Sequence, residues 1–143
     1  MIEFKSKNLL LLTGAGFTKN FGGFLGSEMW EQILHDKEIQ SNKNLRGLLL
    51  EDIDFESVYS SIILNRNLSK EDKSTIGRVI ERIYQNLDEA ITKRSTGSSM
   101  PHWGNWGNIV TMFLGKNNEK GFFFTLNQDT LYDKLLKING YRI

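Results

Sequence analysis

The chain has 143 residues, of which 39% are hydrophobic and 24% are charged, and this composition fits one globular domain and excludes a disordered chain. Eighteen Lys and Arg residues balance 17 Asp and Glu residues, so the charge gives no case for a nucleic-acid or membrane partner. The absence of cysteine excludes disulfides, thiolate metal sites and cysteine nucleophiles.

The predicted elements, in chain order, are a strand, several helices, a second strand and a last helix. Apolar runs predict the strands over residues 8–13 and 122–125. Helical spacing and capping residues predict helices that start near Ser27, Asp54, Ser69, Trp106 and Thr130. The helix after Ser69 opens with a capping box to Asp72, runs to about Lys93 and places on one face Ile76, Val79, Ile80, Ile83, Tyr84 and Leu87.

Two short apolar strands that are separated by helices predict an α/β fold with a parallel sheet buried on both faces. A parallel pair normally belongs to a wider sheet. We therefore expect residues 1–143 to form a single domain that is C-terminally incomplete, or whose sheet is completed by a partner chain or by self-association. The longest apolar run, Leu9–Leu12, is too short to cross a membrane, and residues 1–5 lack a signal-peptide layout, so we expect a cytoplasmic protein.

The first strand leads into the glycine-rich segment Gly14–Thr18, which is predicted to be a loop. Glycine permits positive φ and lets backbone N–H groups approach a ligand, so such a loop after a strand suits a pyrophosphate. The segment departs from the common phosphate motifs, because G-x-G-x-x-G would need glycine where Lys19 stands and no Gly-Lys-Ser/Thr triplet is present. A tight strand-to-helix turn without a ligand is the alternative.

The second strand leads into Thr125–Asp129, where an amide and a carboxylate lie two positions apart. Asn127 and Asp129 could hold a ribose hydroxyl, a carboxamide or an attacking water. Either side chain could instead cap the helix that starts near Thr130. Because ligands of open α/β sheets bind outside the carboxyl ends of the strands, the two segments together indicate a nucleotide site.

Together the segments resemble the sirtuin (SIR2-like) superfamily, and more closely its bacterial anti-phage defence members than its protein deacylases. Gly14-Ala15-Gly16-Phe17-Thr18 resembles the family's G-A-G-x-S loop, with Thr18 at the serine position. Thr125-Leu126-Asn127-Gln128-Asp129 resembles its T-x-N-x-D motif. Residues 54–59 are similar to an acidic-aromatic helix found between those motifs.

The resemblance implies a Rossmann-like fold that binds NAD as substrate and cleaves its nicotinamide–ribose bond, with hydrolysis to ADP-ribose and nicotinamide in the defence-type NADases. Carried over by position, Gly14, Ala15, Gly16, Phe17, Thr18 and Thr125 would line the cofactor site. Asn127 would position water or the ribose, and Asp129 would contact the carboxamide.

Two departures from the family limit this prediction. The family's deacylases carry a four-cysteine zinc module, and a chain without cysteine has none, which argues against deacylation and for no zinc. The family's catalytic histidine follows the T-x-N-x-D motif, and no histidine follows Asp129. The general base is then expected beyond residue 143, and this chain alone is expected to be weakly active or inactive.

The sequence does not decide the roles of the two histidines, and it leaves two alternative functions for the protein. His35 reads as a solvated residue near a helix end, and His102 could reach a cleft beside Trp103 and Trp106, which we interpret as packing residues. The alternatives to an NADase are a non-catalytic module that binds NAD or ADP-ribose and a protein-interaction module that docks a partner on the helical middle.

Overall fold

The computed structural model describes residues 9–95, 105, 108–109, 121–127 and 130–138. The chain divides into two compact units, which we call the strand unit (Met1–Gly23 and Ala90–Ile143) and the helical unit (Phe24–Glu89). The described chain is mostly helical and contains a small parallel sheet, as the sequence predicts for an α/β protein. Its elements are β1 (Leu9–Thr13), α1 (Ala15–Lys19), α2 (Gly26–His35), α3 (Lys37–Ser41), α4 (Lys43–Glu51), α5 (Phe55–Leu64), α6 (Lys70–Ser95), β2 (Gly121–Thr125) and α8 (Leu131–Ile138).

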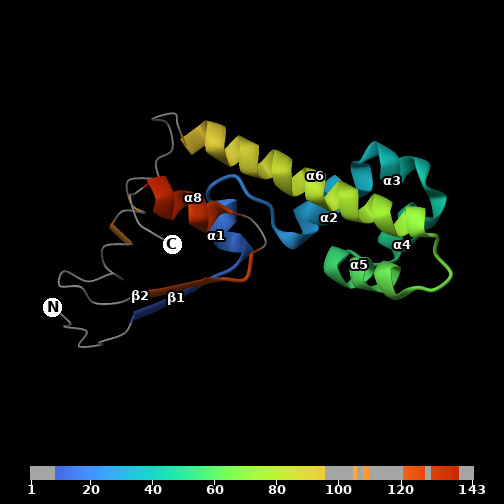
Figure 1. Ribbon diagram of the computed structural model, residues 1–143, viewed down its shortest axis with the longest axis horizontal. Coiled ribbons are helices and arrows are strands. Elements are labelled where there is room, and N and C mark those ends of the chain that lie inside the picture. The colour runs from blue at the N-terminus through green and yellow to red at the C-terminus, as the bar shows by residue number, and fades with distance from the viewer. Residues whose placement is uncertain (1–8, 96–104, 106–107, 110–120, 128–129, 139–143) are drawn as a thin grey trace. The chain divides into compact units, whose positions relative to one another are not determined.

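The two strands of the strand unit lie side by side and run parallel (Figure 1). Leu9 pairs with Gly121, and Thr13 pairs with Thr125, so the two strands end at the same level. Both strands and their carboxyl ends agree with the predicted apolar runs, while residue 8 lies outside the described residues. The loops that follow the strands therefore leave one edge of the sheet together.

One face of this sheet is exposed, which corrects the prediction of strands buried on both faces. Side chains alternate along a strand, so the cross-strand pairs Leu10–Phe122 and Leu12–Phe124 share a face. The exposed fractions are 61% and 46% for the first pair and 56% and 50% for the second. The prediction is wrong for this face, whose four side chains are exposed, whereas Leu11 on the opposite face is half-buried.

A single hydrophobic cluster holds the helical unit together. Each helix from α2 to α6 contributes to it a side chain with no exposed surface, and these are Ile33, Ile39, Leu45, Ile62 and Val79. Burial of one such side chain is worth about 1.5–3 kcal/mol relative to exposure. The cluster therefore supplies the helical unit with a core of its own.

The long helix α6 begins as predicted. The Ser69 hydroxyl accepts the backbone N–H of Asp72 at 3.0 Å, and the Asp72 carboxylate accepts the backbone N–H of Ser69 at 3.2 Å. This capping box satisfies two N–H groups that have no partner inside the helix. The predicted apolar face is confirmed, since the cluster includes Ile76, Val79 and Ile83, and Ile80 and Tyr84 pack against it. The next residue on that face, Leu87, is 5% exposed.

The predicted N-cap of α2 is wrong. The helix begins at Gly26, and the backbone N–H of Leu25 donates to the Glu28 carboxylate at 2.9 Å. Ser27 consequently lies inside the first turn and is exposed. A carboxylate three positions into the helix can satisfy the N–H group at its start, so a serine cap is not needed there.

The helices α3 and α4 were not predicted from the sequence. Each has a polar cap: the Asp36 carboxylate accepts the N–H of Glu38 at 2.9 Å, and the Asn42 amide oxygen accepts the N–H groups of Asn44 and Leu45, each at 3.1 Å. Asp and Asn are common helix caps. These two residues are the signal in the sequence by which both helices could have been found.

The remaining predicted helices have different outcomes. The helix over residues 54–63 is confirmed as α5, whose first N–H groups are accepted by the Asp54 carboxylate. The helix near Thr130 is confirmed as α8, and the Thr130 carbonyl accepts the N–H of Lys134 at 3.1 Å. The helix predicted over residues 106–114 lies largely outside the described residues.

Candidate functional site

The parallel pairing of β1 and β2 brings the two sequence motifs to one edge of the sheet. The ladder continues one residue past β2, because the Leu126 N–H donates to the Thr13 carbonyl at 3.0 Å. The Thr13 hydroxyl also donates to the Phe124 carbonyl, at 3.5 Å. We call residues 13–18 together with residues 125–127 the strand-end site.

The glycine segment is partly helical, which corrects the prediction of a loop. Gly14 is extended, with φ −132° and ψ −170°, and α1 starts at the next residue. Neither this conformation nor the helical one of Gly16 requires glycine, and the positive φ of this region, 92°, belongs to Gly22. A Cβ atom at Gly14 or Gly16 would meet no heavy atom of the described chain within 4 Å. What glycine provides at these positions is open space beside the backbone.

Asn127 joins the two motifs directly. Its amide nitrogen Nδ2 donates to the hydroxyl Oγ1 of Thr18 at 2.5 Å, across 109 positions of sequence. Its backbone N–H donates to the hydroxyl of Thr125 at 3.0 Å. Thr18 is 2% exposed, so the contact is made on a buried hydroxyl.

The alternative role of Asn127 as a helix cap does not fit these contacts. Neither of the two hydrogen bonds described for Asn127 reaches α8, which starts four positions later. Asp129, the other predicted site residue in this motif, lies outside the described residues. The structure thus brings Gly14, Ala15, Gly16, Phe17 and Thr18 to the same edge as Thr125 and Asn127.

The turn after α1 was missed as part of the site. The N–H of Gly23 donates to the Thr18 carbonyl at 2.9 Å, and the N–H of Gly22 donates to the Lys19 carbonyl at 3.1 Å. This pair of hydrogen bonds, with positive φ at Gly22, is a Schellman motif that closes the helix. The adjacent glycines after a possible helix are the signal that could have revealed it.

The structure describes one of the two histidines. His35 lies in α2 of the helical unit, where Nδ1 is 2.8 Å from the Glu31 carbonyl. His102, Trp103 and Trp106 lie outside the described residues. Within the described ranges no group of three or more His, Cys, Asp and Glu side chains could hold a metal ion.

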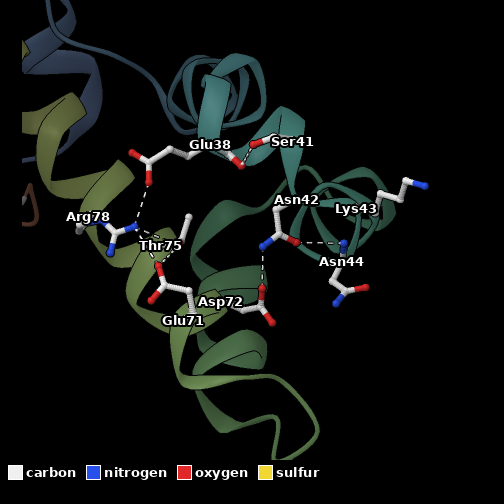
Figure 2. A pocket seen from close by; sticks show the side chains of 9 residues that line it. All are labelled: Glu38, Ser41, Asn42, Lys43, Asn44, Glu71, Asp72, Thr75 and Arg78. Atoms are coloured by element: carbon white, nitrogen blue, oxygen red, sulfur yellow. Dashed lines mark hydrogen bonds and ion pairs between the residues drawn. The ribbon is translucent and has the colours of Figure 1, made fainter.

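The helical unit contains a polar groove of about 500 Å³ between α3, α4 and the start of α6 (Figure 2). Three of its charged side chains pair with one another, since Arg78 lies 2.9 Å from Glu38 and 3.4 Å from Glu71. The Asn42 amide donates to the Asp72 carboxylate at 2.6 Å. The contact of Arg78 with Glu38 links α6 to α3, and the contact of Asn42 with Asp72 links the start of α4 to α6.

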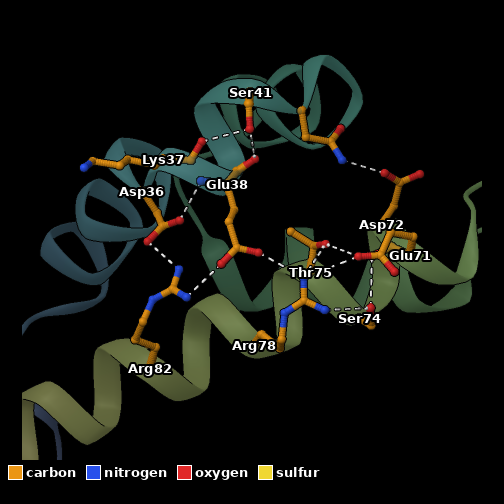
Figure 3. A network of polar contacts seen from close by, with 11 residues as sticks. Asp36, Lys37, Glu38, Ser41, Glu71, Asp72, Ser74, Thr75, Arg78 and Arg82 are labelled. Atoms are coloured by element: carbon orange, nitrogen blue, oxygen red, sulfur yellow. Dashed lines mark hydrogen bonds and ion pairs between the residues drawn. The ribbon is translucent and has the colours of Figure 1, made fainter.

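A second arginine extends the network along α6 (Figure 3). Arg82 lies 2.8 Å from Asp36 and 2.7 Å from Glu38, so two arginines of α6 hold the start of α3. Hydrogen bonds from Arg78 and then Arg82 hold the pKa of Glu38 below its ordinary value, against a smaller opposing effect of desolvation. Hydrogen bonds to Glu38 and then Glu71 raise the pKa of the Arg78 guanidinium, and hydrogen bonds to Asp36 and then Glu38 raise the pKa of the Arg82 guanidinium.

Comparison of the chain with protein-family models, with curated proteins and with solved structures gives no match. The sirtuin-like resemblance therefore remains an interpretation of the motif residues. No described helix is both long enough and apolar enough to cross a membrane.

Proposed function

We propose that the strand-end site binds NAD or ADP-ribose within a Rossmann-like, sirtuin-like domain, and that NAD is the substrate of the completed site. The observation that carries the proposal is the hydrogen bond between Asn127 and Thr18. It joins the two segments whose residues resemble the family's nucleotide-binding motifs, at the carboxyl edge of a parallel pair, where α/β proteins bind ligands.

The open backbone at Gly14 and Gly16 supports a phosphate-binding role. A Cβ atom at either position would project into space that the described chain leaves empty. Glycine lets a backbone approach a pyrophosphate closely, and backbone N–H groups bind its oxygens. The residues present therefore fit the diphosphate of a dinucleotide.

Asn127 fits the role of a group that binds the ribose or a water. Because its amide nitrogen is held by Thr18, the amide oxygen is the atom that it offers as an acceptor to a hydroxyl or water. In hydrolysis the bond from nicotinamide to the ribose carbon breaks, the water oxygen bonds to that carbon, and a base takes the proton. Holding the nucleotide and water in place accounts for much of such catalysis.

We expect binding with little or no hydrolysis by this chain alone. The resemblance implies a catalytic histidine after the T-x-N-x-D motif, and no histidine follows Asp129 in this sequence. This expectation favours the non-catalytic binding module as the state of the isolated chain.

Calorimetry with NAD, with nicotinamide release followed in the same sample, tests the proposal. We expect wild-type binding, an affinity about tenfold lower in Asn127→Ala for the loss of about one hydrogen bond, and no binding in Gly16→Val. Gly47→Val is the matched control, because Gly47 lies in α4 and an added Cβ atom there would also meet no described atom within 4 Å.

Nicotinamide release that is lost in Asn127→Ala would make the isolated chain an enzyme. Absence of NAD and ADP-ribose binding by folded protein would overturn the proposal and leave the interaction module as the alternative.

A further inference from the structure

Thr18 is held from two sides. Its hydroxyl accepts the Asn127 amide, and its carbonyl accepts the N–H groups of Phe21 and Gly23, each at 2.9 Å. The first contact is the link between the two motifs, and the second comes from the turn that follows α1. The position of the Thr18 hydroxyl therefore depends on how closely this turn packs.

Gly23 packs against Thr18 more closely than any other residue could. A Cβ atom on Gly23 would lie 2.3 Å from the methyl carbon Cγ2 of Thr18 and 2.8 Å from its carbonyl oxygen. Two of the three nearest atoms belong to the backbone, so rotation of the Thr18 side chain alone would not relieve the clash. Gly23 is itself buried, which leaves it little room to move away.

We propose that Gly23 is a positioning residue of the strand-end site, which fixes Thr18 and, through it, the amide of Asn127. The packing part of this inference stands on the geometry alone, and its consequence for NAD rests on the proposed function. Gly23 contacts the site through Thr18, because its close approach and its N–H donation are both to that residue.

The test uses Gly23→Ala in the full chain, with NMR signals of the Asn127 side-chain amide as the readout. We expect these signals to shift and their exchange with water to accelerate, and we expect the same of Thr18→Val, which removes the acceptor. Gly26→Ala is the matched control, because a Cβ atom at Gly26 would meet no described atom within 4 Å. Backbone signals of α4 and α5, which contain none of the substituted residues, report whether each variant is folded.

The conservative change Thr18→Ser supplies the rescue. It keeps the hydroxyl and removes Cγ2, the atom nearest to the added Cβ. The double variant Thr18→Ser, Gly23→Ala should therefore recover part of the wild-type Asn127 signals. Unchanged Asn127 signals in folded Gly23→Ala would overturn the inference.

A measurement on the wild-type chain keeps the inference testable even if Gly23→Ala does not fold. The close approach predicts a nuclear Overhauser effect between the α-protons of Gly23 and the γ-methyl group of Thr18, and its absence would overturn the inference.

NAD titration then separates the inference from the proposed function. If wild type binds NAD, we expect Gly23→Ala to weaken binding about tenfold, the size of about one lost hydrogen bond, and Gly26→Ala to leave it unchanged. Unweakened binding in folded Gly23→Ala would overturn the positioning role. If wild type does not bind NAD, the proposed function fails, and the NMR arm still decides whether Gly23 fixes Thr18.

Discussion

At the scale of residues, Thr18 and Gly23 depend on each other. The resemblance leads us to expect serine at position 18, and threonine adds the methyl carbon that lies closest to where a Gly23 side chain would begin. A β-branched residue is stiff about χ1, so its methyl group has few alternative positions. Glycine at position 23 is what allows threonine to occupy position 18 with its hydroxyl on Asn127.

The ion pairs around Glu38 make a prediction about acid stability. Because the pKa of Glu38 is lowered in the folded protein, its contribution to stability is present above the unfolded pKa of about 4.3 and is lost as pH falls through the folded value. We expect the thermal midpoint, followed by circular dichroism, to fall on acidification from about pH 6 to about pH 3 by less in Glu38→Gln than in wild type.

Glu81→Gln is the control for this experiment. Glu81 is an exposed residue of α6 whose carboxylate accepts a hydrogen bond from Gln85, at 3.1 Å. We expect the thermal midpoint of Glu81→Gln to fall on acidification by as much as that of the wild type. Equal acid sensitivity in Glu38→Gln and wild type would show that the ion pairs of Arg78 and Arg82 are too well screened by solvent to matter.

The side chains of the site show where prediction from sequence stops. That residues 14–18 and 125–127 meet could be predicted, because parallel strands carry their loops to one edge. The contact between Asn127 and Thr18 could not, since it depends on side-chain positions set by the surrounding packing. The close approach of Gly23 is likewise a property of the folded turn, which spacing along the chain does not encode.

At the scale of helices, the two candidate serine caps differ in a measurable way. Ser69 accepts the N–H of Asp72, whereas Ser27 is an exposed residue inside the first turn of α2. Ser69→Ala should lower the free energy of unfolding by about 1 kcal/mol, and Ser27→Ala should leave it nearly unchanged. Urea denaturation of both variants measures the difference, and equal effects would contradict the assigned caps.

A helix could be predicted where the helical spacing of apolar residues and an N-terminal capping residue indicated the same segment. For α6 the box from Ser69 to Asp72 and the long apolar stripe are both local features, so the sequence contains them in full. The five-residue helix α3 is too short to show a period, and it is held by Ile39 in the core and by arginines of α6. Tertiary contacts of this kind override weak local signals.

At the scale of the whole molecule, the helical unit should fold by itself. Its cluster draws fully buried side chains from all of its helices, and every residue of that cluster falls within Phe24–Glu89. A fragment of residues 24–89 should therefore give a helical circular dichroism spectrum and a cooperative thermal transition. Folding of so small a domain is marginal, so we expect a lower midpoint than in the full chain.

Leu45→Asp in the same fragment is the control, because it places a charge at a position with no exposed surface and should abolish the transition. A fragment that is unfolded without this change would mean that the helical unit depends on the strand unit for its stability.

The distance in sequence between β1 and β2 has a consequence for the order of folding. Thr18 and Asn127 lie 109 positions apart, and a loop of that length is entropically costly to close before other contacts have formed. The helical unit in between makes its contacts over shorter separations, which form faster. During synthesis β1 is made first, and it has no strand to pair with until the helical unit and then β2 have been made. We therefore expect the strand-end site to assemble after the helical unit.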